Sequence, residues 1–477
     1  MKFQFKKSGF NKIAYIFPLA ALFTFGCEAP PATNTTATAN TAAVNTAPAA
    51  TPAASPAQSK AAALPVTLPV LDAMFAEENF AGELKSKLQL TDEQIDKLKT
   101  TARSAVSNLS ESGEDTGSTR AAKERSSRQI SEILGEEKTA QLFEMVSQRW
   151  NGGENADGNS GGAANAKPGA IPTDTRIVVN APAYRMDLFD NGKLVKTYKI
   201  GIGYPEFPLP VGMRKADTII FNPTWTPPDE PWVKGKFAPG KQVEAGSKDN
   251  PLGPIKIPIG LPSLVHGGKQ PAKLGGFASH GCVGLTNGQI QDFAFNIARL
   301  SGTELMQEEV KNYEKQKSET KNFKLEKSVP VELRYETIVV EDGKLKIFRD
   351  VYERGTNTEE NLRAVLDAYG VSFDSLNAQN RQKISDGLKQ MAINATGQPV
   401  GVNAANSNSN VNQNSNANSN VNQNSNANSK TGNASKVNDN SEGGSVTRTI
   451  KGKKEVVFEL AELKGKGFPA PVNFSRQ

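Results

Sequence analysis

The residue types best suited to nucleophilic catalysis are scarce in this chain and gather in one short window. The 477 residues include two histidines, His266 and His280, and two cysteines, Cys27 and Cys282. Both histidines and Cys282 lie in the segments His-Gly-Gly and Ser-His-Gly-Cys, which a short loop separates. A thiol with a free pKa of about 8.5 is mostly protonated at neutral pH, and a nearby imidazole can accept its proton. The window therefore predicts a cysteine nucleophile, Cys282, activated by a histidine.

The residues that follow Cys282 predict a helix. Thr286 or Asn287 can cap it, and Gly302 lies just past its expected end. Its apolar face would consist of Ile290, Phe293, Ala294 and Ile297. The positive end of such a helix favours a thiolate at Cys282. Gly281 permits a tight turn before the cysteine, and the backbone amides of Gly281 and Cys282 are candidate donors of an oxyanion hole.

Composition argues against several other classes of function. The formal net charge of +6 is small for 477 residues, and the basic residues form no single block, so we expect no nucleic-acid partner. Two cysteines do not make a disulfide framework. No cluster of histidines and cysteines has the spacing of zinc ligands, so the sequence implies neither a metal nor an organic cofactor.

The N-terminus has the pattern of an export signal. Four lysines precede an apolar run from Ile13 to Phe25, which is too short to span a bilayer. The run ends at Gly26 and Cys27, a position that resembles the lipidation site of bacterial lipoproteins, although Thr24 stands where leucine is usual. Cleavage after Gly26 without lipidation is the alternative. Either way we expect an exported protein of the periplasm or cell envelope, anchored to a membrane if Cys27 carries lipid.

Changes in composition divide the chain into folded modules and polar linkers. Segments rich in alanine, asparagine, serine and glycine cannot bury enough apolar surface to fold. We expect a signal peptide at 1–26, a disordered tether at 27–63, a small helical module at 64–150, a linker at 151–173, a mainly β catalytic domain at 174–305, an α/β extension at 306–395, a disordered Asn/Ser-rich repeat at 396–446 and a tail with one candidate strand at 447–477.

Three local patterns predict secondary structure within these segments. Thr91 and Gln94 have the spacing of a capping box at the start of a helix. Alternation from Tyr184 to Leu188, followed by Asp190-Asn191-Gly192, predicts a β-hairpin. Residues 329–335 and 345–348 are expected to pair as a second hairpin around Asp342-Gly343.

The window around Cys282 resembles the signature of the L,D-transpeptidase catalytic domain family. That signature is a His-Gly pair, then about fifteen residues, then Ser/Thr-His-Gly-Cys. Asn-Pro-Thr-Trp at 222–225 and Asn-Pro-Leu-Gly at 250–253 look like two further family segments. The resemblance covers about residues 174–355. It implies a β-sandwich or barrel with a short helix after the nucleophile.

The resemblance also implies roles for individual residues. Cys282 would be the nucleophile and His266 the base that activates it. Supporting roles would fall to His280 by hydrogen bonding, to Gly267, whose carbonyl would orient His266, and to Gly281 and Ser279 in the oxyanion loop. The thiolate would attack the amide before the terminal D-alanine of a peptidoglycan tetrapeptide stem. D-alanine would leave, and an amine from a neighbouring stem or from a protein lysine would resolve the thioester.

One position departs from the family pattern. Gly284 stands where many members have an arginine that is thought to help hold the site or a substrate carboxylate. Lys269, Lys273 and Arg214 are candidates to replace it. The long loop 227–246 carries aromatic residues that are candidates for a lid, Trp232 and Phe237.

Three other functions remain to be weighed. A hydrolase of the same fold, such as an L,D-carboxypeptidase, would let water resolve the thioester, and no residue separates it from a transpeptidase. A non-catalytic peptidoglycan-binding lipoprotein would have lost its activity together with the arginine. A papain-like protease is disfavoured, because its cysteine precedes its histidine along the chain, whereas here His266 precedes Cys282.

Overall fold

A computed structural model of the chain describes residues 66–77, 79–107, 118–150, 168–226, 241–260, 263–400 and 450–472. These residues lie in one compact unit, residues 56–477. The predicted signal peptide and tether, the lipidation candidate Cys27, the lid candidates Trp232 and Phe237, and most of the Asn/Ser-rich repeat lie outside the described residues. Within the described part of the chain, no helix is both long and apolar enough to cross a bilayer.

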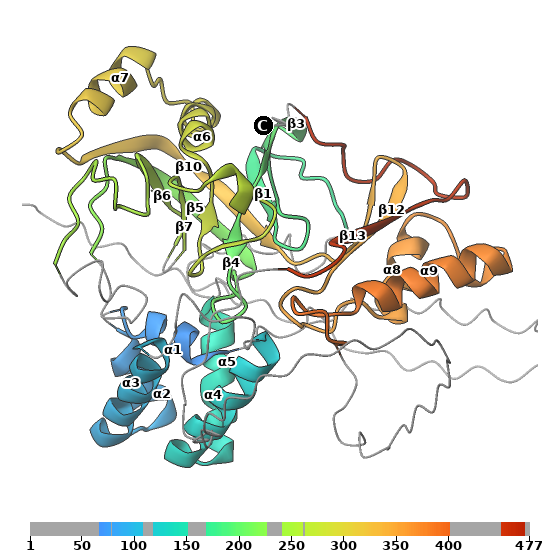
Figure 1. The fold of residues 1–477 in the computed structure, drawn as a ribbon, viewed down its shortest axis with the longest axis horizontal. Coiled ribbons are helices and arrows are strands. Elements are labelled where there is room, and N and C mark those ends of the chain that lie inside the picture. The colour runs from blue at the N-terminus through green and yellow to red at the C-terminus, as the bar shows by residue number, and fades with distance from the viewer. Residues whose placement is uncertain are drawn as a thin grey trace, which may run out of the picture. The chain divides into compact units, whose positions relative to one another are not determined.

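The described residues between 66 and 150 are mainly helical, as the sequence predicts (Figure 1). The helices are α1 (Leu68–Met74), α2 (Phe80–Leu88), α3 (Asp92–Ser107), α4 (Thr119–Leu134) and α5 (Glu136–Trp150). The predicted capping box starts α3, because Gln94 N donates to Thr91 Oγ1 at 3.2 Å and Thr91 N donates to Gln94 Oε1 at 3.1 Å. The helices share an apolar core of their own, which includes Leu71, Leu84, Leu98, Ile130, Leu142 and Val146. This separate core makes the helical module a folded body in its own right.

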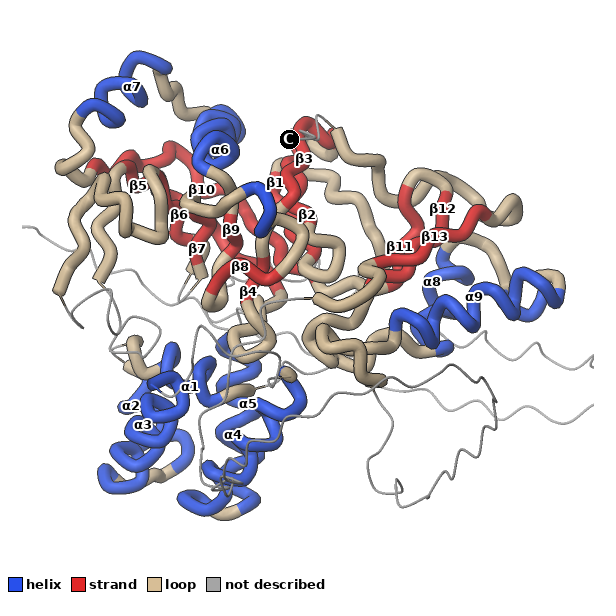
Figure 2. The backbone as a smooth tube through the Cα atoms, in the orientation of Figure 1, coloured by secondary structure: helices blue, strands red, loops and turns tan. Residues whose placement is uncertain are grey.

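A large mixed sheet dominates residues 174–334, so the mainly β prediction is confirmed (Figure 2). Its strands are β1 (Arg176–Asn180), β2 (Arg185–Asp190), β3 (Lys193–Lys199), β5 (Gly212–Phe221), β6 (Ile255–Pro258), β7 (Leu264–His266), β9 (Val283–Gly284) and β10 (Lys321–Arg334). They run in the order β3-β2-β1-β10-β5-β6-β7-β9. The pairs β1–β10 and β7–β9 are parallel, and the other pairs are antiparallel. The predicted Asp-Asn-Gly turn joins β2 to β3, with Asn191 and Gly192 at positive φ.

The predicted helix after the nucleophile is also present. Helix α6 spans Asn287–Leu300, and Thr286 caps it with Gln289 in a reciprocal capping box. The face formed by Ile290, Phe293, Ala294 and Ile297 is buried, as expected, and packs against β6 and β10. A short helix, α7 (Gln307–Lys315), follows. The start of α6 is therefore fixed at the edge of the sheet where β9 ends.

The second predicted hairpin differs from the structure in one strand. Residues 329–334 belong to β10, which lies between β1 and β5 in the large sheet. They stay there because Val329, Val331 and Leu333 are buried in the core of that sheet. The hairpin around Asp342-Gly343 instead joins β11 (Ile338–Glu341) to β12 (Lys344–Phe348).

The candidate strand in the tail joins this hairpin. Residues 455–459 form β13 (Glu455–Glu459), which pairs with β12 to give a three-stranded sheet. Helices α8 (Glu359–Ala368) and α9 (Ala378–Met391) cover one face of it (Figure 2). Two strands complete the description near the large sheet, β4 (Ile202–Gly203) and β8 (Phe277–Ser279), which pair in parallel.

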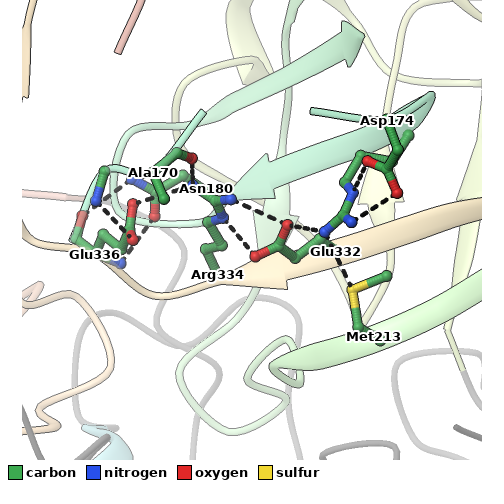
Figure 3. Close-up of polar contacts among 9 residues, drawn as sticks. Ala170, Asp174, Asn180, Met213, Glu332, Arg334 and Glu336 are labelled. Carbon is green, nitrogen blue, oxygen red and sulfur yellow. Dashed lines mark hydrogen bonds and ion pairs between the residues drawn. The ribbon is translucent and has the colours of Figure 1, made fainter. Parts of the chain in front are cut away.

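Charged side chains are fully matched where β10 lies beside β1 (Figure 3). Glu332 accepts from Arg176 Nη1 at 2.9 Å and from Arg334 Nε at 2.8 Å. Arg176 also binds Asp174, and Arg334 lies 3.7 Å from Glu336. The side chains of Glu332 and Arg334 are only 7% and 9% exposed. We refer to these five residues as the charge-paired cluster.

Candidate active site

Two neighbouring parallel strands bring His266 and Cys282 to one cleft. His266 is the last residue of β7, and Cys282 directly precedes β9. Their register pairs Val265 with Val283 and His266 with Gly284. Both reactive residues line a cleft of about 1160 Å³, together with Ser279, His280 and Gly281. Five of the six catalytic or orienting residues predicted in this region therefore line a common space, and Gly267 is not among the lining residues.

The His266 imidazole is buried and held by a backbone carbonyl. Its side chain is 3% exposed, and Nδ1 lies 2.8 Å from Gly267 O. A carbonyl only accepts hydrogen bonds, so Nδ1 carries the proton and Nε2 of the neutral ring is left as a base. Burial, followed by the charge of Lys269, lowers the pKa of His266 to about 3. The imidazole is therefore neutral at physiological pH.

The Cys282 thiol is partly exposed in the cleft and forms no disulfide. Burial raises its pKa above the ordinary value, against the lowering effects of the Leu264 backbone, Lys269 and Lys256. Desolvation is the largest effect on this pKa, and it opposes the thiolate that the start of α6 was expected to favour. At neutral pH the site holds a thiol beside a neutral imidazole.

The loop from Ser279 to Cys282 is closed by the serine side chain. Ser279 Oγ accepts from Cys282 N at 3.0 Å and donates to Cys282 O at 2.5 Å. Gly281 has φ +87°, a left-handed conformation that favours glycine, as the predicted tight turn requires. Since the Cys282 amide already donates to Ser279, it is not available as the oxyanion donor that the sequence suggested. The Gly281 amide remains a candidate.

His280 packs between two aromatic rings that the sequence analysis did not single out. Its ring centroid lies 5.0 Å from that of Tyr204 and 4.7 Å from that of Phe207, both in edge-to-face geometry. Tyr204 N also donates to Ser279 O at 2.9 Å. These contacts fix the residue before Gly281 and so help to hold the Cys282 loop. The sequence signal was a pair of aromatic residues in the proline-rich loop after residue 203.

Two Asn-Pro segments brace the backbone beneath His266. Asn250 Nδ2 donates to Pro223 O at 2.7 Å, which ties the two segments together. A Cβ built on Gly253 would lie 2.4 Å from Gly268 N, so the Asn-Pro-Leu-Gly loop packs directly on the His-Gly-Gly loop. Gly268 N in turn donates to Asn287 Oδ1 at 2.8 Å. The His266 loop is therefore held from one side by this loop and from the other by α6.

The structure separates the three candidates for the missing arginine. Lys269 lines the cleft, and its side chain packs across Gly284. Arg214 is half-buried, is not among the residues that line the cleft, and donates to the Trp150 carbonyl. Lys273 is exposed in the short 3-10 helix Pro271–Lys273. Of these three candidates, Lys269 alone lines the cleft with His266 and Cys282.

A second lysine beside the pair, Lys256, was missed by the sequence analysis. It lies on β6 directly opposite His266 and lines the cleft. Its signal was a single charge inside the apolar strand Ile255-Lys256-Ile257, whose two isoleucines are buried. Such a position is unusual for a lysine that serves only solubility.

Residues of the helical module line the same cleft. They include Val70, Asp72 and Phe75 near α1 and Lys99 and Arg103 on α3. Asp72 and Arg103 form an ion pair at 3.0 Å. The described residues contain no group of three or more His, Cys, Asp or Glu side chains that could hold a metal ion.

The part of the chain that contains His266 and Cys282 is similar to known proteins. Residues 174–320 match the family model described as the L,D-transpeptidase catalytic domain, YkuD. "Probable L,D-transpeptidase YbiS" of Escherichia coli (strain K12) is 31% identical over 119 residues, which cover 24% of this chain and 39% of that relative. The chain thus spans about two fifths of the length of this curated relative. The family resemblance predicted from the motif is confirmed for residues 174–320.

Solved structures give matches of low overall similarity. The catalytic domain of an E. faecium L,D-transpeptidase is 18% identical, with a TM-score of 0.23, and the match covers 35% of this chain and 100% of that domain. An L,D-transpeptidase from Mycobacterium smegmatis is 14% identical, with a TM-score of 0.20 and coverage of 34% and 58%.

Proposed function

We propose that this protein is an exported L,D-transpeptidase that acts on peptidoglycan stem peptides through a thioester on Cys282. The observation that carries the proposal is the pairing of Cys282 with His266 in one cleft, with Nδ1 of the histidine held by Gly267 O at 2.8 Å. That contact leaves Nε2 as the base. The match of residues 174–320 to the family model supports the same assignment.

The resting protonation states set the order of the chemistry. As Cys282 Sγ attacks the carbonyl carbon before the terminal D-alanine, His266 Nε2 accepts the thiol proton. The carbon–nitrogen bond then breaks, the proton passes to the departing D-alanine amine, and a thioester remains. An acceptor amine attacks the thioester, loses a proton to His266 and regenerates the thiol. A neutral pair suits this sequence, because charge develops only as the reaction proceeds.

The supporting residues have separate tasks in this scheme. The Gly281 amide stabilises the oxyanion that forms on the attacked carbonyl. Ser279 holds the loop that presents Cys282, and the Gly267 carbonyl fixes the tautomer of His266. His280, packed between Tyr204 and Phe207, keeps the loop in register. No cofactor enters the scheme.

The location and partners follow from the N-terminal sequence. An export signal at 1–26 with a lipid on Cys27 would anchor the protein to a membrane of the cell envelope, and the tether at 27–63 would let the enzyme reach the wall. The acceptor is the amine of a neighbouring stem or a lysine of a protein to be attached. The product is a crosslinked or protein-bearing wall, which contributes to cell wall organisation and cell shape.

Intact mass spectrometry tests this proposal. The full chain and its Cys282→Ala variant are incubated with a carbapenem and, in parallel, with tetrapeptide muropeptides. We expect a covalent adduct and release of D-alanine with the unsubstituted chain alone. Products joined to an amine identify a transpeptidase, whereas tripeptides identify an L,D-carboxypeptidase. A folded protein that gives neither adduct nor D-alanine would instead be a non-catalytic peptidoglycan-binding lipoprotein.

A further inference from the structure

Gly203 lies where the Cys282 loop meets the end of β4. It is the last residue of β4 and pairs with Ser279 of β8. A Cβ built on Gly203 would lie 3.2 Å from both N and Cα of Gly281 and would overlap the carbonyl oxygen of Phe207, so only glycine fits there. The backbone of Gly203 therefore packs directly on the residue whose amide is the candidate oxyanion donor.

The carbonyl of Gly203 is held by a side chain from the C-terminal extension. Tyr352 Oη donates to Gly203 O at 2.9 Å, and both residues are buried. Burial raises the pKa of the Tyr352 phenol, so the hydroxyl keeps the proton that it donates. The Tyr352 ring stacks on that of Phe277, with centroids 6.4 Å apart and an angle of 24° between the planes. Since Phe277 begins β8, Tyr352 contacts both β4 and the strand that leads into the Cys282 loop.

Tyr352 is itself fixed by a buried hydrogen-bond network. Its amide donates to Tyr335 Oη at 2.7 Å, and the two rings stack with centroids 5.6 Å apart. Tyr335 Oη donates in turn to Asp350, whose side chain is fully buried. Asp350 also accepts from three successive backbone amides, those of residues 354–356. The turn that carries Tyr352 is therefore preorganised, and moving its hydroxyl would disturb several buried hydrogen bonds at once.

We propose that Tyr352 is a positioning residue that holds the Gly281 amide toward the attacked carbonyl group, through the backbone of Gly203. Tyr352 is not among the residues that line the cleft, so it acts on the reaction only through the backbone that it holds. It also lies beyond residues 174–320, so the extension supplies part of the support of the site. The role of the Gly281 amide rests on the proposed function, whereas the bracing of the Cys282 loop rests on the contacts alone.

Two tyrosine-to-phenylalanine variants of the full chain form a matched pair. Tyr352→Phe removes the hydroxyl and keeps the ring that stacks on Phe277. Tyr198→Phe is the control, because Tyr198 is also buried in the core of the large sheet and its hydroxyl donates to Asp292 at 2.6 Å. Neither Tyr198 nor Asp292 lines the cleft. Each variant loses a hydroxyl hydrogen bond, so both should lower the melting temperature by a similar amount.

Hydrogen exchange, followed by mass spectrometry of peptides, tests the bracing without turnover. The amides of Tyr204 and Cys282 report on this junction, because they donate to Ser279 at 2.9 Å and 3.0 Å. We expect Tyr352→Phe to speed their exchange at least about threefold, since the loss of one buried hydrogen bond makes local opening more frequent. Tyr198→Phe should leave their exchange unchanged.

Two reactions of Cys282 measure the effect on the oxyanion donor. At saturating carbapenem, Tyr352→Phe should lower the acylation rate about tenfold, with the half-saturating concentration within about twofold, because the donor is displaced only where charge develops. Alkylation by iodoacetamide uses the same thiol but forms no oxyanion. Its rate, measured on the peptide that contains Cys282, should fall less than about threefold. Tyr198→Phe should change neither rate.

The outcomes separate this proposal from the proposed function. Unchanged exchange or unchanged acylation in Tyr352→Phe overturns the proposal. Equal losses of acylation and alkylation also overturn it, since they place the defect at the thiol rather than at the oxyanion donor. So do equal effects of Tyr198→Phe, which would reflect a general loss of stability. Faster exchange in a protein whose Cys282 is never acylated supports the bracing and overturns the proposed function.

Discussion

Two regions of the large sheet differ in the environment that they give to their ionisable side chains. In the charge-paired cluster, between β1 and β10, Glu332 is held by Arg176 and Arg334, and every charged group has a partner (Figure 3). At β6, β7 and β9, the cleft instead holds His266 and Cys282, with Lys256 and Lys269 on either side of the histidine. The first arrangement stabilises the fold, whereas the second gathers ionisable groups in a cleft, as at many functional sites.

The same contrast is visible in protonation. Burial acts to raise the pKa of Glu332, yet Arg334 and Arg176 bring it below the ordinary value, so the group stays charged. In the cleft, burial lowers the pKa of His266 to about 3 and raises the pKa of Cys282, so both groups stay neutral. Burial is common to the two regions. The neighbouring charges decide whether the buried group is ionised.

The largest effect should come from His266→Gln. Loss of the base should lower kcat/KM for D-alanine release by about 10²-fold to 10⁴-fold, the usual contribution of a general base. Turnover of a tetrapeptide stem measures it, and the melting temperature of the variant shows whether the fold persists. Activity within tenfold of the unsubstituted chain would mean that another group accepts the Cys282 proton and that His266 is not the base.

Glu332→Gln should have a comparable cost, but in stability. It removes the carboxylate between Arg176 and Arg334 and leaves the buried Arg334 guanidinium with only Glu336, at 3.7 Å, which should cost about 3 kcal/mol. Urea unfolding followed by circular dichroism measures the loss. Below the unfolding transition, kcat/KM should stay within about twofold, because the cluster does not line the cleft. A loss of activity without a loss of stability would mean that Glu332 contributes to catalysis rather than to the stability of the fold.

Local chemistry was predictable from the sequence. The capping box of Thr91 and Gln94 and the turn at Asn191-Gly192 depend on residues a few positions apart, and both are present. The helix after Cys282 was predictable from apolar spacing alone. The gathering of His266 and Cys282 in one cleft could be inferred because both residues fall in one short window of a recognisable motif.

What the sequence could not provide depends on partners far along the chain. Residues 329–334 pair with β1, about 150 residues earlier, and no local pattern encodes such a partner. The importance of Lys256 depends on its register opposite His266. The protonation of Cys282 depends on how deeply the fold buries it, because desolvation is the largest effect on its pKa. In each case a tertiary contact decides between two locally reasonable interpretations.

Lowering the pH should reduce the stability of the fold through His266. Folding lowers the pKa of His266 from 6.5 to about 3, so below pH 6.5 the unfolded chain binds a proton that the folded chain does not. Stability from this group is therefore complete above pH 7 and declines as pH falls, by about 2 kcal/mol between pH 7 and pH 5. Glu332, with its lowered pKa, stays ionised over most of this range and contributes little.

Urea unfolding of the unsubstituted chain and of His266→Gln at pH 7 and pH 5 measures this difference. Other groups, such as Asp187, whose pKa burial raises to about 6, titrate in both proteins and cancel in the comparison. The unsubstituted chain should lose about 2 kcal/mol more than the variant over this interval. Identical pH dependence would show that His266 is not held neutral by the fold.

The smallest effect should come from an ion pair that is matched but exposed. Lys324 and Asp217 join β10 to β5 at 2.7 Å, with side chains that are 69% and 43% exposed. Water screens such a pair, so Asp217→Asn should change the free energy of unfolding by less than about 1 kcal/mol. Urea unfolding beside Glu332→Gln makes the test. A loss of stability as large as that of Glu332→Gln would mean that an ion pair stabilises this fold equally whether it is exposed or buried.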